Sequence, residues 1–270
     1  MILARLCFVL GIVAFGDGLE SSREPAQPVV ADRFLIVPIH AHILTAPDLE
    51  LADCKLKDED VTRSIGKLNT IWNKAGIHFG LDSIVREPAS QRDRFRLLAE
   101  LNGGELEASD FLMLMPKQTR AFDGFHAYFF HELPFNGAYV GDDCVVVQEG
   151  ARLKAVDGGI DDPIARVLGF ALGRALSLQP RREPETNLMA LGTTGVSIDA
   201  DDAERARRVA KTIKGVLTFA EVQHAAEAAQ TAGQAERAKL IRAWLDEIAR
   251  AANPKGDPKS CGEVAVLRVE

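Results

Sequence analysis

The apolar stretch between Asp162 and Pro180 constrains the fold more than any other part of the sequence. Asp161-Asp162-Pro163 combines a capping carboxylate with a proline at the first helical position, which predicts the start of a helix. Its only charged residues are Arg166 and Arg174, and Pro180 ends it. A helix that is apolar on most sides must be covered on most sides. We therefore expect this helix at the centre of a packed domain.

The segments before this helix alternate between strand and helix patterns. Strands are predicted for residues 34–44, 77–85, 111–115, 126–131 and 137–147. Helices are predicted for residues 58–76 and 91–101, the first with an aspartate at its start and a glycine at its end. This order predicts an α/β (α+β) fold with a mixed sheet and packed helices.

From residue 199 onward the sequence becomes rich in alanine. Helices are predicted for residues 199–213, 218–231 and 234–251, and an edge strand for residues 263–269. One face of the last helix is apolar and consists of Ile241, Trp244, Leu245, Ile248 and Ala252. We expect this face to pack within the chain, with a partner-binding hairpin as the alternative. The predicted units are a main domain over 34–214, a helical extension over 215–253 and a tail over 254–270.

Residues 1–16 have the pattern of a secretory signal. A lone Arg5 precedes the apolar run 6–15, and small residues occupy positions 14 and 16. The run is too short to span a bilayer, so we expect an exported chain (periplasmic, secreted or in the cell envelope) with no membrane span after processing and an exposed lead-in over 17–33. The net charge is −7, and no basic stripe is present, so no nucleic-acid partner is expected.

Two segments carry a family pattern: Arg166-Val-Leu-Gly-Phe-Ala-Leu-Gly-Arg-Ala-Leu-Ser-Leu-Gln-Pro180 and Asn187-Leu-Met-Ala-Leu-Gly-Thr-Thr-Gly195. With the strand–helix–strand opening, they resemble secreted zinc metallopeptidases of the metzincin type over about residues 34–212. The resemblance implies a metzincin-like mixed, twisted sheet. In that family the helix carries H-E-x-x-H-x-x-G-x-x-H, and a later turn containing methionine lies beneath the metal.

The resemblance also implies that the family's chemical groups have been replaced. The first histidine position falls at Phe170, the glutamate at Ala171, the second histidine at Arg174, the glycine at Ser177 and the third histidine at Pro180, while Met189 matches the methionine of the turn. Phenylalanine and proline cannot bind zinc, an arginine repels it, and alanine cannot act as a general base. The implied protein is a pseudopeptidase with no catalytic residue, metal ligand or cofactor. It would bind a peptide or protein partner, with Arg174 as the candidate contact to a carboxylate.

Two other functions compete with this interpretation. The first is an active metallopeptidase or hydrolase with a non-standard metal site built from His40, His42 or His131 and acidic residues. His40 and His42 lie two apart on a strand and so share a face. His131-Glu132 begins like H-E-x-x-H, but Pro134 and Phe135 prevent a helix from completing the motif. The second is a structural, envelope-associated module that docks through its C-terminal helices.

The remaining histidines and cysteines are predicted to be structural. His78, His126 and His224 are isolated in the sequence and are expected at the surface or in the core. Outside the signal, Cys54, Cys144 and Cys261 remain. One bridge, between Cys54 and Cys144, or unpaired buried thiols are both consistent with this number. Asp142 and Asp143 are expected to raise the pKa of the Cys144 thiol, which disfavours a thiol nucleophile.

Overall fold

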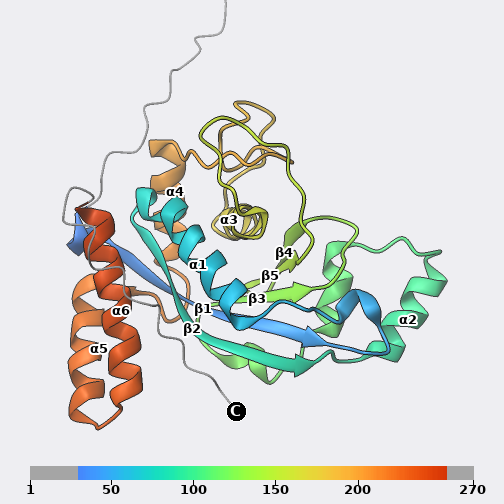
Figure 1. Ribbon diagram of the computed structural model, residues 1–270, viewed down its shortest axis with the longest axis horizontal. Coiled ribbons are helices and arrows are strands. Elements are labelled where there is room, and N and C mark those ends of the chain that lie inside the picture. Colours follow the sequence, from blue (N-terminus) through green and yellow to red (C-terminus); the bar gives the residue numbers. More distant parts are fainter. Residues whose placement is uncertain (1–29, 254–270) are drawn as a thin grey trace, which may run out of the picture.

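A mixed sheet with the strand order β2-β1-β3-β5-β4 organises residues 30–253, which are the residues described by the computed structural model (Figure 1). The strands are β1 (Leu35–Thr45), β2 (Ile77–Pro88), β3 (Phe125–Phe130), β4 (Gly137–Gly141) and β5 (Cys144–Gln148). All neighbouring pairs are parallel except β4 with β5, and a short β6 (Leu217–Thr218) pairs antiparallel with the start of β1. The predicted mixed sheet is confirmed.

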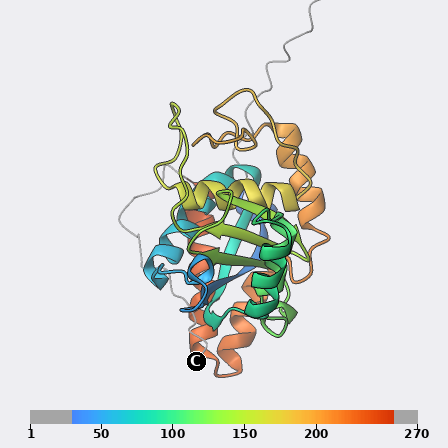
Figure 2. The same ribbon diagram turned by 90° about the vertical axis from the view of Figure 1, so that its right-hand side faces the viewer.

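One face of the sheet, the upper one in Figure 1 and called the front face here, is covered by three helices (Figures 1 and 2). They are α1 (Asp58–Trp72), α3 (Pro163–Ala175) and α4 (Ala200–Ala210). The Asp162 carboxylate accepts a hydrogen bond from the Ala165 backbone N–H at 3.0 Å and so caps α3 where the sequence predicts its start. Leu168 and Leu172 of α3 are completely buried between α1 and the sheet. The predicted central, buried helix is confirmed.

The back face of the sheet carries two separate apolar clusters. One lies beneath α2 (Arg92–Leu101) and the 3-10 helix η4 (Ala108–Leu114). The other lies beneath a hairpin formed by α5 (Phe219–Thr231) and α6 (Ala235–Ala252). In this second cluster the Trp244 ring packs so closely on Gly80 that a Cβ added there would lie 2.9 Å from the ring. The apolar face of the last helix therefore packs within the chain, as expected.

The strand predicted for residues 111–115 is wrong, because residues 111–114 belong to the 3-10 helix η4 and Met115 follows its end. Phe111 and Leu114, three residues apart, are both buried on one side of that helix, and the Phe111 ring lies 5.4 Å from the Phe95 ring. A short apolar run fits a buried helical turn as well as a strand. The strand predicted for 137–147 is two strands, joined by a turn in which Asp142 and Asp143 have φ of 50° and 54°.

Of the two alternatives for Cys54 and Cys144, the bridge is wrong and the unpaired buried thiols are confirmed, since both cysteines are free and buried. They lie in different apolar clusters on opposite faces of the sheet, Cys54 with α1 and α3 and Cys144 with η4. Burial raises the pKa of the Cys54 thiol to about 12 and that of the Cys144 thiol to about 11. For Cys144, Asp142 and Asp143 act in the same direction, as predicted, although burial is the larger cause.

Several predictions fall outside the described residues. They are the signal at 1–16, most of the lead-in at 17–33, the tail with its edge strand at 263–269, and Cys261. Short 3-10 helices complete the described part: η1 (Ala31–Arg33), η2 (Glu50–Ala52), η3 (Asn73–Ala75) and η5 (Thr119–Ala121). Within residues 30–253, no helix combines the length and apolarity that crossing a membrane requires.

Candidate functional site

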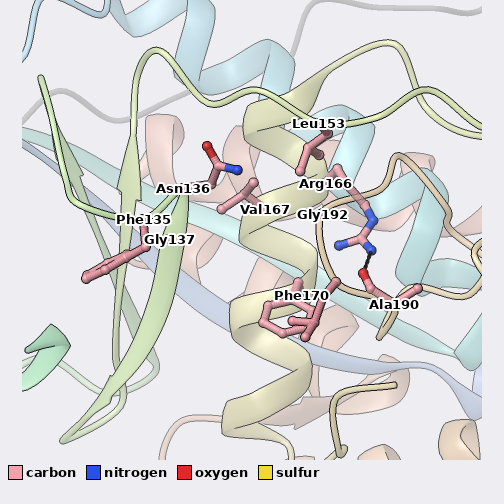
Figure 3. A pocket seen from close by; sticks show the side chains of 10 residues that line it. Phe135, Asn136, Gly137, Leu153, Arg166, Val167, Phe170, Ala190 and Gly192 are labelled. Atoms are coloured by element: carbon pink, nitrogen blue, oxygen red, sulfur yellow. Dashed lines mark hydrogen bonds between the residues drawn. The ribbon is translucent and has the colours of Figure 1, made fainter. Parts of the chain in front are cut away.

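A pocket with a volume of about 190 Å³ opens beside α3, between the start of β4 and the loop at residues 187–195 (Figure 3). Its lining is mostly apolar and includes Phe135, Leu153, Val167, Phe170 and Leu191, with one charged side chain, Arg166. Phe170 is the residue that the family resemblance places at the first histidine position. Of the positions named from the resemblance, Phe170 lines this pocket.

Two glycines of α3 let the loop at 187–195 approach the helix closely. A Cβ added at Gly173 would lie 2.6 Å from the Met189 sulfur, and one added at Gly169 would lie 3.2 Å from the Leu188 Cδ1. Residues four apart share one helix face, so the two glycines form a continuous seat for this loop. Met189 is almost completely buried there. The predicted turn and the predicted helix are thus in direct contact.

Arg166 is a buried cation held by backbone carbonyls. Its Nε donates to the Gly195 carbonyl, and its Nη2 donates to the carbonyls of Ala190 at 2.7 Å and Asn187 at 3.5 Å. Burial lowers the pKa of its guanidinium to about 10. Among residues 30–253 it forms no ion pair with a carboxylate, and the guanidinium carbon lies 5.9 Å from the centre of the Phe170 ring. The pocket wall therefore carries a positive charge that no carboxylate among residues 30–253 neutralises.

The other positions predicted from the resemblance lie away from the pocket. Ala171 is completely buried in the front core, and Pro180 is exposed. Arg174 donates from Nη1 to the Leu178 carbonyl at 2.8 Å and to the Gln179 Oε1 at 3.0 Å. Arg174 therefore binds acceptors in the turn just after its own helix, and the pocket lining contains Arg166 but not Arg174. From the sequence, Arg166 was identified only as a charged residue on an apolar helix. Its spacing of four residues from Phe170 could have indicated that both side chains lie on the same face of the helix.

Ser177, at the predicted glycine position, has a left-handed backbone with φ of 63°. Such a conformation costs an ordinary L-residue about 1–2 kcal/mol, and glycine adopts it freely at an entropic cost of roughly 0.5–1 kcal/mol. We expect Ser177→Gly to raise the free energy of unfolding by about 0.5–1 kcal/mol, measured by urea unfolding. Ser177→Ala, the control, should give no gain. A loss of stability in the glycine variant would contradict the assignment of this turn as strained.

The sheet brings together histidines that are distant in sequence. The β1–β3 register pairs His40 with His126, and the His42 Nε2 lies 3.0 Å from the His126 Nδ1. On its other side, the His42 Nδ1 lies 2.8 Å from Glu87 Oε1. The His40 and His126 rings stack with centres 5.2 Å apart, so their nitrogens do not converge on one point. His126 is a buried residue whose ring nitrogens both have partners, as the core alternative of the prediction expects, and it lies at the centre of a buried row with His40 and His42.

His131 does not join this row but pairs with Glu149 at the end of β3. Across residues 30–253, no group of three or more His, Cys, Asp or Glu side chains is arranged to hold a metal ion. His78 is buried, and its Nδ1 lies 3.2 Å from the Asn73 Oδ1, while His224 is exposed on α5. These two are the core and surface residues that the sequence predicts.

Comparisons with known proteins identify similar structures but no family. No model of a known protein family matches the sequence, and no curated protein matches it. Mature mirolysin of Tannerella forsythia in complex with a cleaved peptide has a TM-score of 0.42 and 12% identity, over 64% of this chain and 90% of that chain. A second structure, mirolysin in complex with compound 9, has a TM-score of 0.41 and 12% identity, over 83% of this chain and 99% of that chain.

Proposed function

We propose that this chain is an exported, non-catalytic homologue of metzincin metallopeptidases that binds an extended segment of a peptide or protein. One observation carries the proposal. The loop at residues 187–195, called the Met189 loop from here on, packs on Gly173 of α3, while Phe170, the residue at the position of the family's first histidine, faces the pocket. The close packing of helix and loop supports a retained helix–turn frame, and the side chain of Phe170 has no metal-binding or acid–base group. The proposed export rests on the signal-like residues 1–16.

The residues at the predicted ligand positions do not fit a zinc ion. Zinc is held by neutral imidazoles, thiolates or carboxylates, and Phe170, Arg174 and Pro180 offer none of these. The predicted general base is also absent, because Ala171 has no proton-accepting group and its side chain is buried in the core. General acid–base catalysis alone contributes ~100- to 10,000-fold to rates of this type. Binding without hydrolysis is therefore the activity that these residues support.

An extended peptide has a binding edge next to the pocket. Within residues 30–253, β4 pairs only with β5, so its other edge presents unpaired backbone groups. Gly137, the first residue of β4, also lines the pocket and packs against Val167 of α3 without room for a side chain. A peptide added to this edge as a further strand would place alternate side chains toward the helix, with one at the pocket.

The test measures metal binding, peptide binding and cleavage on the processed chain. We expect no stoichiometric zinc after dialysis against trace zinc, by mass spectrometry, and no rise in Tm on adding zinc. Specific binding at 100 times Kd would add about 2.7 kcal/mol of stability. Extended peptides from a random library should be bound and recovered intact. Tightly held zinc with chelator-sensitive cleavage would overturn the proposal, and His40, His42 and His131 would then be substituted in turn.

A matched variant tests the predicted register independently. Phe170→His, Arg174→His and Pro180→His together restore the three ligand positions, the first two on one face of α3. If the register is right, this triple variant should acquire one zinc per chain and a zinc-dependent rise in Tm, whereas the unmodified chain should not. A folded triple variant without zinc would show that the register, and with it the metzincin relationship, is wrong.

A further inference from the structure

We infer that the pocket beside α3 binds a carboxylate on a short aliphatic stem, with Arg166 as its counter-ion; this rests on the proposed function and specifies its ligand. The pocket volume of about 190 Å³ lies below the ~300–1,000 Å³ of typical small-molecule sites. It matches a single side chain or chain terminus of a bound peptide better than a free cofactor. The chemistry of the lining then decides which group enters.

Arg166 is the group that selects the ligand. Its side chain is about 2% exposed, and it has five N–H donors, of which Nε and Nη2 are used on carbonyl groups. Nη1 makes no hydrogen bond within residues 30–253, and Figure 3 shows the guanidinium turned toward the space between Val167 and Phe170. Carbonyl dipoles orient the cation without neutralising it, and burying an uncompensated charge costs several kcal/mol. A ligand carboxylate would remove this cost.

Neighbouring polar groups are already engaged. Asn136 donates from Nδ2 to the Arg152 carbonyl at 2.8 Å and accepts at Oδ1 from the Arg152 N–H at 3.0 Å. Glu185, close in sequence to the loop that holds Arg166, is paired with Lys154 at 2.7 Å. Arg166 is therefore the lining side chain with a charge and an unused donor.

The apolar walls define the rest of the ligand. Leu153, Val167 and Leu191 can cover an aliphatic stem, while the guanidinium binds the carboxylate at its end. A glutamate side chain of an extended peptide has this composition. So does the free C-terminus of a peptide that ends with a small apolar residue. Both present a carboxylate to Arg166, and blocked peptides separate the two.

The test uses fluorescently labelled hexapeptides of alanine and valine, blocked at both ends, with one central Glu, Gln, Leu or Lys. A charge-assisted hydrogen bond contributes about 1.5–3 kcal/mol, so by anisotropy the Glu peptide should bind roughly 10- to 100-fold more tightly than its Gln counterpart. A second arm compares the Leu peptide with a free and with an amidated C-terminus. Preference for the free C-terminus alone assigns the carboxylate to the chain end, and preference for Glu alone assigns it to a side chain.

Three variants locate the effect. Arg166→Gln should abolish the preference for the acidic peptide, and its folding is checked by circular dichroism because Arg166 also holds the loop at 187–195. Leu191→Trp narrows the pocket mouth at a side chain that is 60% exposed, so it should weaken binding of the acidic peptide without unfolding the chain. Leu101→Trp, at a 74% exposed side chain on α2 across the sheet, is the matched control and should change nothing.

The outcomes separate this inference from the proposed function. Equal binding of Glu and Gln peptides and of free and amidated termini, or unchanged binding in Leu191→Trp, overturns the carboxylate pocket and leaves peptide binding standing. If none of these peptides binds but members of the random library do, the carboxylate pocket alone is wrong. Binding of no peptide in either experiment overturns both.

Discussion

Replacing Trp244 by alanine is expected to lower the free energy of unfolding by about 3–5 kcal/mol. Its side chain is about 3% exposed, lies against Gly80 of β2 and packs with Phe34 and Ile36 of the sheet. The guanidinium of Arg237 lies 5.6 Å from the ring centre and loses its aromatic partner in the same variant. Urea unfolding followed by the fluorescence of Trp72, the remaining tryptophan, measures the loss.

Two controls make this result interpretable. Trp244→Phe keeps most of the apolar contact and should lose less than the alanine variant. Leu97→Ala, at a 55% exposed side chain on α2, should stay within about 0.5 kcal/mol of the unmodified chain. A loss below about 1 kcal/mol for Trp244→Ala would mean that the α5–α6 hairpin is not held on the sheet by this face. The same face would then be free to dock onto another protein.

Lowering the pH from 7 to 5 is expected to destabilise the fold by about 2 kcal/mol for each of His78 and His126. Burial lowers the pKa of His78 to about 3 and that of His126 to about 4, from an ordinary value of 6.5. Below pH 6.5 the unfolded chain binds a proton on each ring, whereas the folded chain does so only near pH 3–4. The contribution of both rings to stability is therefore full above pH 6.5 and falls below it, down to about pH 4 for His126 and about pH 3 for His78. Urea unfolding at half-unit steps from pH 7.5 to 5 gives the slope.

Histidine variants assign this slope to its source. His126→Phe loses the contact with His42, so its free energy of unfolding at pH 7 should be lower. Between pH 7 and pH 5, however, this free energy should fall by about 2 kcal/mol less than in the unmodified chain, because one titrating ring has been removed. His224→Ala, at an exposed histidine on α5, should leave the slope unchanged. Equal stability at pH 7 and pH 5 in the unmodified chain would show that neither buried ring has a strongly lowered pKa.

Local patterns predicted most of the elements but not how distant residues meet. The apolar helix, its Asp162 cap and the strands predicted for 34–44, 77–85 and 126–131 follow from spacing over a few residues, and these are present. The row of His40, His42 and His126 depends on the parallel register of β1 and β3, which no local pattern contains. The bridge considered between Cys54 and Cys144 fails for the same reason, because the sequence does not tell which face of the sheet a cysteine occupies.

The resemblance directed attention to two segments of the chain, α3 and the Met189 loop, that the structure places in contact. It also drew attention to Arg174, whose donors are used on the end of its own helix. The pocket arginine is Arg166, whose role depends on carbonyls more than twenty residues further along the chain. The assignment of each family position to a residue of this chain remains a prediction.

The edge of β4 that pairs with no strand among residues 30–253 has a consequence for how copies of this chain behave in concentrated solution. A free sheet edge is a template for any extended chain, including an aggregating second copy. Here the strand has five residues, begins and ends with glycine, and is followed by two acidic residues in a left-handed turn. These features limit the number of backbone hydrogen bonds that a second copy can form and place negative charge beside them. A peptide bound along β4 would cover this edge, so the same ligand would also act as protection against self-association.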